Sequence, residues 1–200
     1  GILAVIIIFQ PELRRALEQL GRRGFLGLSR QIEEELVTNV IKEVTDAVSF
    51  LAEHRIGALI VIERKTGLMD YIETGIKLEA NLSSELLKNI FLPRTPLHDG
   101  AVILRGGVVV AASCYLPLSE NLISKELGTR HRAGVGITEI SDAIVVIVSE
   151  ETGRISLAIQ GHLETILSNE GITTRLLEEL NSPKKYSKPF WNRNVKEKRG

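Results

Sequence analysis

The stretch AVILRGGVVVAASCYLP, residues 101–117, consists of two apolar runs joined by Gly106-Gly107. Two glycines between apolar runs are typical of a tight β-hairpin, because glycine adopts the positive φ angles that such turns require. A second apolar pair, AIVVIVSEETGRISLAIQG at residues 143–161, predicts two more strands that turn at Thr152-Gly153. GALIVIER, residues 57–64, predicts a further strand, and its continuous apolar centre indicates that both of its faces are covered.

Helical patterns lie before, between and after these strands. From Gln31 to His54 apolar residues recur at helical spacing, which predicts an amphipathic helix with a core face of Ile32, Leu36, Val40, Val44, Ala47, Val48 and Leu51. Further helices are expected over Ser83–Phe91, with Ser83 or Ser84 as N-cap, in the early part of residues 123–141, and near Thr173–Leu180. Residues 66–75 are expected to form a loop. The sequence therefore predicts an α/β (α+β) fold, with a central mixed β-sheet covered by helices on both sides.

Length and composition indicate one globular domain and exclude several classes of protein. Two hundred residues suffice for a substantial core, and the chain is 44% apolar and 25% charged with a formal net charge of zero. This balance is typical of neither a disordered chain nor a broadly basic nucleic-acid binder, and 4% aromatic residues are too few for a base-stacking surface. The single cysteine, Cys114, cannot form an internal disulfide, which favours a reducing compartment.

The two ends of the chain differ from its centre. Residues 1–9 include the apolar run ILAVIIIF, which is far short of the roughly 20 residues that cross a bilayer but is followed at once by arginines. The run is therefore either the cytoplasmic end of a membrane helix or a short buried strand or helical turn. Residues 10–30 are expected to form a basic helix and a glycine-punctuated linker, and residues 31–181 the globular domain. Residues 182–200 are expected to be a basic tail, either solvated or in contact with anionic lipid.

Three polar clusters lie at the ends of apolar strands. The first is His98-Asp99-Gly100, directly before the hairpin. Carboxylate oxygens suit Mg²⁺ or Mn²⁺, imidazole suits the softer Mn²⁺ as well, and glycine lets a ligand approach the backbone. The alternative is a turn capped by Asp99, and the pattern alone favours this simpler interpretation.

The second cluster is GTRHR, residues 128–132. Arg130 and Arg132 would point roughly 200° apart on a regular helix, so both could grip one ligand only in a turn or at a helix start. Gly128 and Thr129 allow such a break. Two guanidiniums, an imidazole, a hydroxyl and free backbone amides match the needs of a polyphosphate. A solvated basic helix face is the alternative.

The third cluster is SEET, residues 149–152, at the end of the run AIVVIV. It is either a plain hairpin loop or the source of a second carboxylate that converges with Asp99 on one cation. Together, the three clusters contain the groups that metal-assisted phosphoryl or nucleotidyl transfer requires. The sequence contains no P-loop, no strand-linked G-x-G-x-x-G, no G-x-S-x-G and no Cys-x-x-Cys, which argues against the corresponding sites.

The order of these clusters resembles the diadenylate cyclase family. The resemblance is carried by Asp99-Gly100-Ala101, CYLPLS at residues 114–119, GTRHRA at residues 128–133 and SEET at residues 149–152, which include the family's DGA and RHR motifs. FQPELRRALEQLGR at residues 9–22 and DYIETG at residues 70–75 are similar to the membrane-bound branch known as CdaA or DacA. The resemblance covers roughly residues 9–180.

The resemblance implies synthesis of cyclic di-AMP from two ATP molecules with release of two pyrophosphates. In the family each subunit binds one ATP, and two sites face each other in a homodimer, so that each 3′-hydroxyl attacks the α-phosphate of the other ATP. Mg²⁺ or Mn²⁺ would neutralise the phosphates, while positioning and electrostatics supply most of the catalysis. A cell-membrane location with a cytoplasmic catalytic domain is implied, which favours the membrane interpretation of residues 1–9. A membrane-anchored regulator and a phosphoglucosamine mutase are the implied partners, and no nucleic acid is.

The same resemblance assigns roles to individual residues. Asp99 would bind the metal and help to activate the attacking hydroxyl, and His98 and Glu151 would complete the protein's share of the metal ligands. The catalytic set would be Asp99, Arg130, His131 and Arg132. The ATP site would be formed by Gly100, Ala101, Tyr115, Leu116, Gly128, Thr129, Arg130, His131, Arg132 and Ser149, with Tyr115 and Leu116 beside the adenine.

Two features depart from the family pattern, and two other functions remain open. The loop over residues 119–127 is one residue shorter than expected, and Gly134 stands where alanine is expected. The first alternative function is a non-catalytic domain that senses adenine nucleotide or cyclic di-AMP. Retention of Asp99 and both arginines argues against it, since a sensor has no use for a metal-activated hydroxyl. The second is a metal phosphoesterase built on His98-Asp99.

Overall fold

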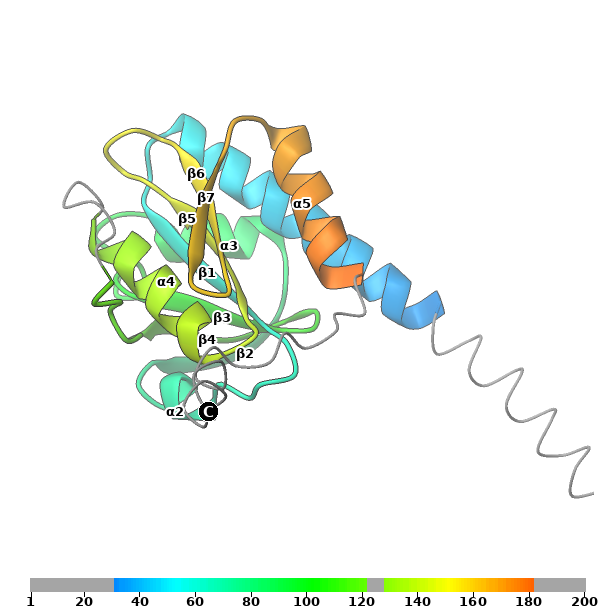
Figure 1. Ribbon diagram of the computed structural model, residues 1–200, viewed down its shortest axis with the longest axis horizontal. Coiled ribbons are helices and arrows are strands. Elements are labelled where there is room, and N and C mark those ends of the chain that lie inside the picture. Colours follow the sequence, from blue (N-terminus) through cyan, green and yellow to red (C-terminus); the bar gives the residue numbers. More distant parts are fainter. Residues whose placement is uncertain (1–30, 122–127, 182–200) are drawn as a thin grey trace, which may run out of the picture.

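A mixed sheet of seven strands runs through the described part of the chain, which in this computed structural model comprises residues 31–121 and 128–181 (Figure 1). Its strand order is β2-β4-β3-β1-β5-β6-β7. The strands are β1 Ala58–Glu63, β2 Ile76–Asn81, β3 Ala101–Arg105, β4 Val108–Cys114, β5 Ile144–Val148, β6 Ile155–Ile159 and β7 His162–Ile166. β1 and β3 pair in parallel and the other neighbours pair antiparallel, which confirms the mixed sheet.

Helices cover both faces of this sheet, as predicted (Figure 1). One face packs against a long helix over residues 31–53, α3 (Ser84–Phe91) and α5 (Asn169–Asn181), which contribute Val44, Leu87 and Leu176 to a common core. The opposite face packs against α4 (Thr129–Ile140) and α2 (Met69–Ile72), which contribute Val135 and Ile72 to a second core.

The central strands are buried on both faces because their residues are almost all apolar. Every residue of β5, IVVIV, is buried, and so are the first five of β1, ALIVI. Continuous apolar runs of this kind are typical of strands between two helical layers. The interpretation of residues 57–64 as a strand covered on both sides is confirmed.

Several local predictions are confirmed. Gly106 turns the hairpin between β3 and β4 with a φ of 57°. Ser83 is the N-cap of α3, since its side chain accepts a hydrogen bond from Leu86 N at 3.2 Å. The last helix is present, but it begins at Asn169, four residues before the predicted start.

Other expectations are wrong. Residues 66–75 are not all loop, because Leu68 and Ile72 are buried and anchor the short helix α2. The sequence did not predict β2 or β7, the two edge strands, whose residues are mostly exposed and partly polar. Ile32 and Leu36 are 50% and 48% exposed and do not join the core face, because the first turns of the long helix extend beyond the sheet (Figure 1).

The expectations for residues 1–9, 10–30 and 182–200 lie outside the described residues, as does most of the loop over residues 119–127. Among the helices that are described, none has the length and apolar character that a bilayer crossing requires.

Two glycines bring α4 close to its neighbours. A Cβ atom at Gly136 would overlap the carbonyl oxygen of Pro117 and lie 2.9 Å from Ser119 N, so the helix touches this backbone directly. A Cβ atom at Gly134 would lie 2.8 Å from Cδ1 of Ile147, which is the end of a flexible side chain. The glycine at position 134 is therefore compatible with the alanine that the family pattern leads us to expect.

We predict that Gly136→Ala lowers the free energy of unfolding by about 2 kcal/mol, because the backbone at Pro117 cannot move away without disturbing the chain around it. Gly134→Ala is the matched control in the same helix. It should be nearly neutral, since a shift of Ile147 is offset by the better helix propensity of alanine, worth about 1 kcal/mol. Urea denaturation measures both, and equal losses in the two variants would contradict this account of the contact.

Candidate active site

The pairing of the central strands brings the three polar clusters to one edge of the sheet. β1 pairs in parallel with β3, with Ile60 opposite Val102, and antiparallel with β5, with Ala58 opposite Val148. The residues before β3 and those after β5 therefore leave the sheet at the same edge, about two strand spacings or roughly 10 Å apart. α4 precedes β5 and packs on it, so the start of this helix lies at that edge too.

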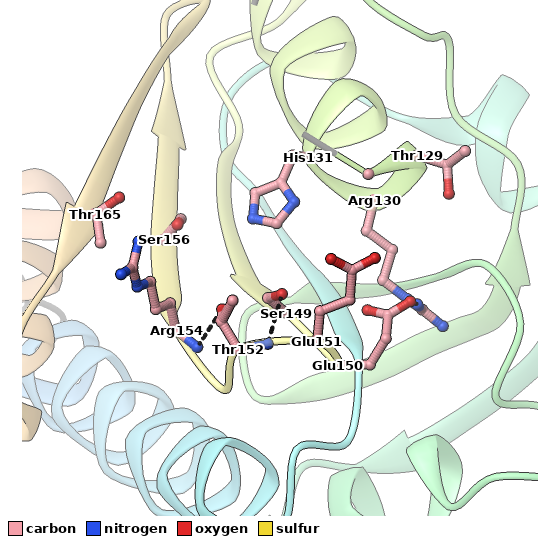
Figure 2. A pocket seen from close by; sticks show the side chains of 11 residues that line it. Thr129, Arg130, His131, Ser149, Glu150, Glu151, Thr152, Arg154, Ser156 and Thr165 are labelled. Carbon is pink, nitrogen blue, oxygen red and sulfur yellow. Dashed lines mark hydrogen bonds and ion pairs between the residues drawn. The ribbon is translucent and has the colours of Figure 1, made fainter. Parts of the chain in front are cut away.

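A cavity of about 310 Å³ opens at this edge between the start of α4 and the loop that joins β5 to β6 (Figure 2). This volume is within the range of small-molecule sites. Its walls are formed by Gly128, Thr129, Arg130, His131, Ser149, Glu150, Glu151, Thr152, Arg154, Ser156 and Thr165. Most of the predicted phosphate-binding residues and the predicted metal ligand Glu151 thus line one cavity.

Arg130 is held in this cavity by an ion pair with Glu150, and the pair has room only because residue 57 is a glycine. Its Nη1 atom lies 2.5 Å from Oε1 of Glu150. A Cβ atom at Gly57, just before β1, would lie 2.7 Å from Nη1 of Arg130 and 2.7 Å from Oε2 of Glu150. Nε of Arg130 is buried and has no hydrogen-bond partner among the described residues. The pair therefore occupies the space that a side chain at position 57 would take.

His131 is the most buried of the ionisable side chains that line the cavity, with 9% of its surface exposed. Burial lowers its pKa; Arg130 acts in the same direction, whereas Glu150 and Glu151 oppose it. The imidazole is therefore neutral at physiological pH and can both donate and accept a hydrogen bond. Figure 2 shows the ring directed into the cavity from α4, with the Glu151 carboxylate on the opposite wall.

The loop after β5 is held by its own hydrogen bonds. Ser149 N donates to Arg154 O at 3.0 Å, and Gly153 N donates to Ser149 O at 2.8 Å. Thr152 N donates to Ser149 Oγ at 3.3 Å, and Gly153 has a φ of 71° (Figure 2). The predicted turn at Thr152-Gly153 is confirmed, and it fixes the backbone that carries both glutamates.

Arg132 points away from the cavity. Its Nε and Nη2 atoms donate to Ser119 O at 3.4 and 3.3 Å, on the loop that packs against α4. The reason is helical geometry, because α4 begins at Thr129 and residues two apart on a helix lie roughly 200° apart. The structure therefore brings Arg130 and His131 together, but not Arg132.

The predicted residues around Asp99 form a second group at the same edge. Ser113 Oγ donates to the carbonyl oxygen of Asp99 at 2.7 Å. Gly100 has a φ of 103°, and a Cβ atom there would lie 2.8 Å from the carbonyl carbon of Ser113, so this position requires glycine. Tyr115 is 71% exposed, and its backbone N donates to Thr74 Oγ1 at 2.9 Å. None of these residues lines the cavity itself.

Ala101, Leu116 and His98 complete this second group. Ala101 is fully buried in the core beneath α4, and Leu116 is half-buried and packs against the same core. Nδ1 of His98 lies 2.6 Å from Thr95 O. A ring nitrogen that donates to a backbone carbonyl leaves Nε2 as the acceptor, which is the arrangement of a metal-binding histidine.

The described residues contain no group of three His, Cys, Asp or Glu side chains placed to hold a metal ion together. His98, Asp99 and Glu151 thus lie at one edge of the sheet, but their side chains do not form a complete metal site by themselves. Mg²⁺ in nucleotide enzymes is commonly held by one or two carboxylates and by the phosphates of the substrate. The donor chemistry fits such an ion, and the assignment of these three ligands stays a prediction.

Sequence reasoning missed four residues of this region. Gly57 gave no signal beyond its place before a strand, and Thr165 lies on an edge strand that was not predicted. Arg154 and Ser156 were regarded only as parts of a strand. The serine within the apolar run ISLAI was the one available signal, because a hydroxyl at a buried strand position needs a partner.

Residues 45–163 match the family model described as DisA bacterial checkpoint controller nucleotide-binding, the DAC model. The chain belongs to the diadenylate cyclase family. "Cyclic di-AMP synthase CdaA" of Bacillus subtilis is 58% identical over 90% of this chain and 66% of its own length. "Diadenylate cyclase" of Mycoplasma pneumoniae is 42% identical over 74% of this chain and 73% of its own length.

Solved structures support the same membership. A crystal structure of a double mutant of DacA from Staphylococcus aureus superposes with a TM-score of 0.70 at 54% identity, covering 76% of this chain and 99% of that one. The second similar structure is described as a hypothetical membrane spanning protein from Bacillus cereus, with a TM-score of 0.62 and 35% identity. It covers 83% of this chain and 90% of that one. The diadenylate cyclase domain fold is thus established for the described residues.

We predict that Gly57→Ala weakens the binding of ATP about tenfold, because the new methyl group displaces Arg130 and removes one charge-assisted hydrogen bond to the phosphates. The free energy of unfolding should change by less than about 1 kcal/mol, since only the ends of two flexible side chains must move. Gly67→Ala is the matched control, because nothing lies within 4 Å of a Cβ atom there. Titration calorimetry with Mn²⁺ present measures the affinity, and unchanged affinity in Gly57→Ala would contradict the role of this glycine.

Proposed function

We propose that this chain is the catalytic part of a diadenylate cyclase, which condenses two ATP molecules into cyclic di-AMP and releases two pyrophosphates. The observation that carries the proposal is that the residues before β3, which include Asp99, and the cavity lined by Arg130 and Glu151 lie at the same edge of the sheet in a chain of this family. The chain spans 66% of the length of the Bacillus subtilis relative, and the proposal concerns the part that it contains.

The triphosphate of ATP would occupy the cavity. Arg130 and the neutral ring of His131 would donate hydrogen bonds to phosphate oxygens. The backbone N–H groups at the N-terminal end of α4, where the helix dipole is positive, would donate as well. Gly128, Thr129 and Ser149 line the same cavity and would complete the contacts. The phosphates are thereby held still for the reaction, which is the main contribution that a phosphoryl-transfer site makes.

The phosphates and the two glutamates of the cavity are all negatively charged and would repel one another. A divalent cation, Mg²⁺ or Mn²⁺, would offset this repulsion. Asp99, His98 and Glu151 are its proposed protein ligands. Support comes from the hydrogen bond between His98 Nδ1 and Thr95 O, which orients the ring, and from the exposed position of the Asp99 side chain at the edge. Asp99 would also accept the proton of the attacking 3′-hydroxyl.

The nucleoside would lie toward Gly100, Ala101, Tyr115 and Leu116, beside Asp99. Gly100 has no side chain, so a ligand can approach the backbone at this point. The exposed ring of Tyr115 is available to stack on an adenine. Arg132 lies outside the cavity, so its proposed role is to hold the loop at Ser119 against α4 rather than to bind phosphate in this chain's own cavity.

Catalysis would require a homodimer in which two such edges face each other. One ATP fills one site, and the second reacting nucleotide must come from a second copy. The exposed side chains of Asp99 and Tyr115 at the edge support this arrangement. We further propose that the whole protein is located at the cell membrane, with this domain on the cytoplasmic side, in line with the description of the Bacillus cereus protein as membrane-spanning.

We predict that Asp99→Asn abolishes formation of cyclic di-AMP, by roughly a thousandfold or more, and changes the stability of the fold little, because the side chain is exposed. Asp46→Asn, on the exposed face of the long helix, is the matched control. Chromatography of an incubation with ATP and Mn²⁺ measures the product, with GTP as the comparison substrate. Normal turnover in Asp99→Asn would exclude the assigned role, and intact ATP with the unaltered chain would favour a nucleotide sensor.

Dilution tests the homodimer. If two copies form the active unit, the rate per chain should fall as the enzyme is diluted below the dissociation constant of the dimer, approaching a second-order dependence on chain concentration. Initial rates over a hundredfold range of enzyme concentration, with sedimentation to measure the dimer, provide the test. A rate that is proportional to enzyme concentration where the sedimenting species is a monomer would exclude the dimer as the active unit.

A further inference from the structure

The cavity extends beyond the residues that the proposed function uses. Four more of its lining residues, Thr152, Arg154, Ser156 and Thr165, lie in the loop before β6, at the start of β6 and on β7 (Figure 2). Thr152 closes the SEET motif, whereas the other three lie outside the sequence motifs that carry the family resemblance. We call Arg154, Ser156 and Thr165 the far wall below.

Ser156 is the feature that points to a ligand. It is 3% exposed and lines the cavity, yet within the described residues its hydroxyl makes no hydrogen bond. Its cross-strand neighbour on β5 is Ile147, so the surroundings on that side are apolar. Among the described residues Arg130 Nε is the buried side-chain atom without a hydrogen-bond partner, so the Ser156 hydroxyl is not sealed off and is available to a ligand from the cavity.

Arg154 and Thr165 present further polar groups on the same face of the sheet. Arg154 and Ser156 are two residues apart along the strand direction, and Thr165 lies directly opposite Ser156 in the register of β6 and β7. Arg154 is exposed and makes no ion pair with any described residue, in contrast to Arg130. Figure 2 shows the three side chains together, across the cavity from Arg130.

We propose that the far wall is a subsite for the terminal phosphates of ATP and for the pyrophosphate that leaves. A planar guanidinium with two hydroxyls beside it is the donor set that a phosphate group accepts from. The residues at the start of α4 then bind the part of the triphosphate that lies nearer to the α-phosphorus, where the reaction takes place. The inference rests on the proposed function, and it extends it by assigning residues that select a triphosphate over a monophosphate.

The reaction explains why a separate subsite is needed. The bond between the 3′-oxygen and the α-phosphorus forms as the bond from the α-phosphorus to the bridging oxygen breaks. The bridging oxygen keeps the electron pair and leaves in pyrophosphate, while the hydroxyl proton passes to Asp99 and on to solvent. Negative charge therefore grows on the leaving group, and Arg154, unpaired in the described chain, is placed to stabilise it.

Direct binding provides the test. Titration calorimetry with inorganic pyrophosphate, in the presence of Mn²⁺, compares the unaltered chain with Arg154→Gln and Ser156→Ala. We expect affinity to fall about tenfold in Arg154→Gln and about threefold in Ser156→Ala. Affinity for AMP, which lacks the terminal phosphates, should be unchanged in both. Arg64→Gln, beyond the opposite end of β1, is the control and should bind pyrophosphate normally.

Kinetics and stability add independent measurements. In Arg154→Gln the KM for ATP and the inhibition constant of pyrophosphate should rise together, while inhibition by cyclic di-AMP stays the same. Ser156→Ala should unfold at the same urea concentration as the unaltered chain or at a higher one, since the hydroxyl that it removes makes no hydrogen bond to a described residue. Loss of pyrophosphate affinity without loss of stability is a result that a merely structural role would not produce.

The outcomes separate this subsite from the proposed function. Cyclic di-AMP formation with unchanged pyrophosphate affinity in Arg154→Gln would overturn the subsite and leave the function. Equal losses for AMP and pyrophosphate, or no binding of pyrophosphate by the unaltered chain, would overturn it as well. If pyrophosphate binds through Arg154 but the unaltered chain makes no cyclic di-AMP, the subsite stands and the proposed reaction is wrong.

Discussion

Burial of the central strands on both faces is the constraint on which the rest of the structure depends. β3, β1 and β5 lie between two layers of helices, so their interior positions admit only apolar side chains. Polar groups can therefore occur only where these strands end. Because β1 runs with β3 and against β5, the residues before β3 and after β5 meet at one edge. The topology thus decides where chemistry is possible before any particular side chain is considered.

Close approach of α4 to this edge is the second requirement, and small residues make it possible. Gly136 lets the helix touch the backbone at Pro117, and Gly57 leaves room for the ion pair of Arg130 with Glu150. The Glu150 side chain is 54% exposed, so solvent screens the pair and its contribution to stability is small. Its importance is geometric, because it fixes the direction of a long side chain that would otherwise sample several rotamers.

The sequence predicts the parts of this molecule whose signals are local and strong. The apolar runs of β1 and β5, the glycine turn at Gly106 and the cap at Ser83 each identify their element without tertiary information. β2 and β7 are not recognised in the sequence because an edge strand with one solvated face needs few apolar residues. Arg130 and Arg132 belong to the same motif, yet they lie two residues apart at the start of α4, where helical geometry points them in different directions. Gly57, Arg154 and Thr165 join the site only through strand pairing, which no local pattern records.

The charge of the cavity explains what kind of ligand it suits. Arg130 and Arg154 contribute two positive charges, Glu150 and Glu151 contribute two negative charges, and burial keeps His131 neutral by lowering its pKa. A bare polyphosphate would therefore meet a lining without net charge and would be repelled by both carboxylates. A polyphosphate that carries a divalent cation would meet the arginines through its oxygens and the carboxylates through its metal. The lining thus favours the metal complex of a nucleotide over the free anion, and it makes affinity depend on the cation even where no bond is broken.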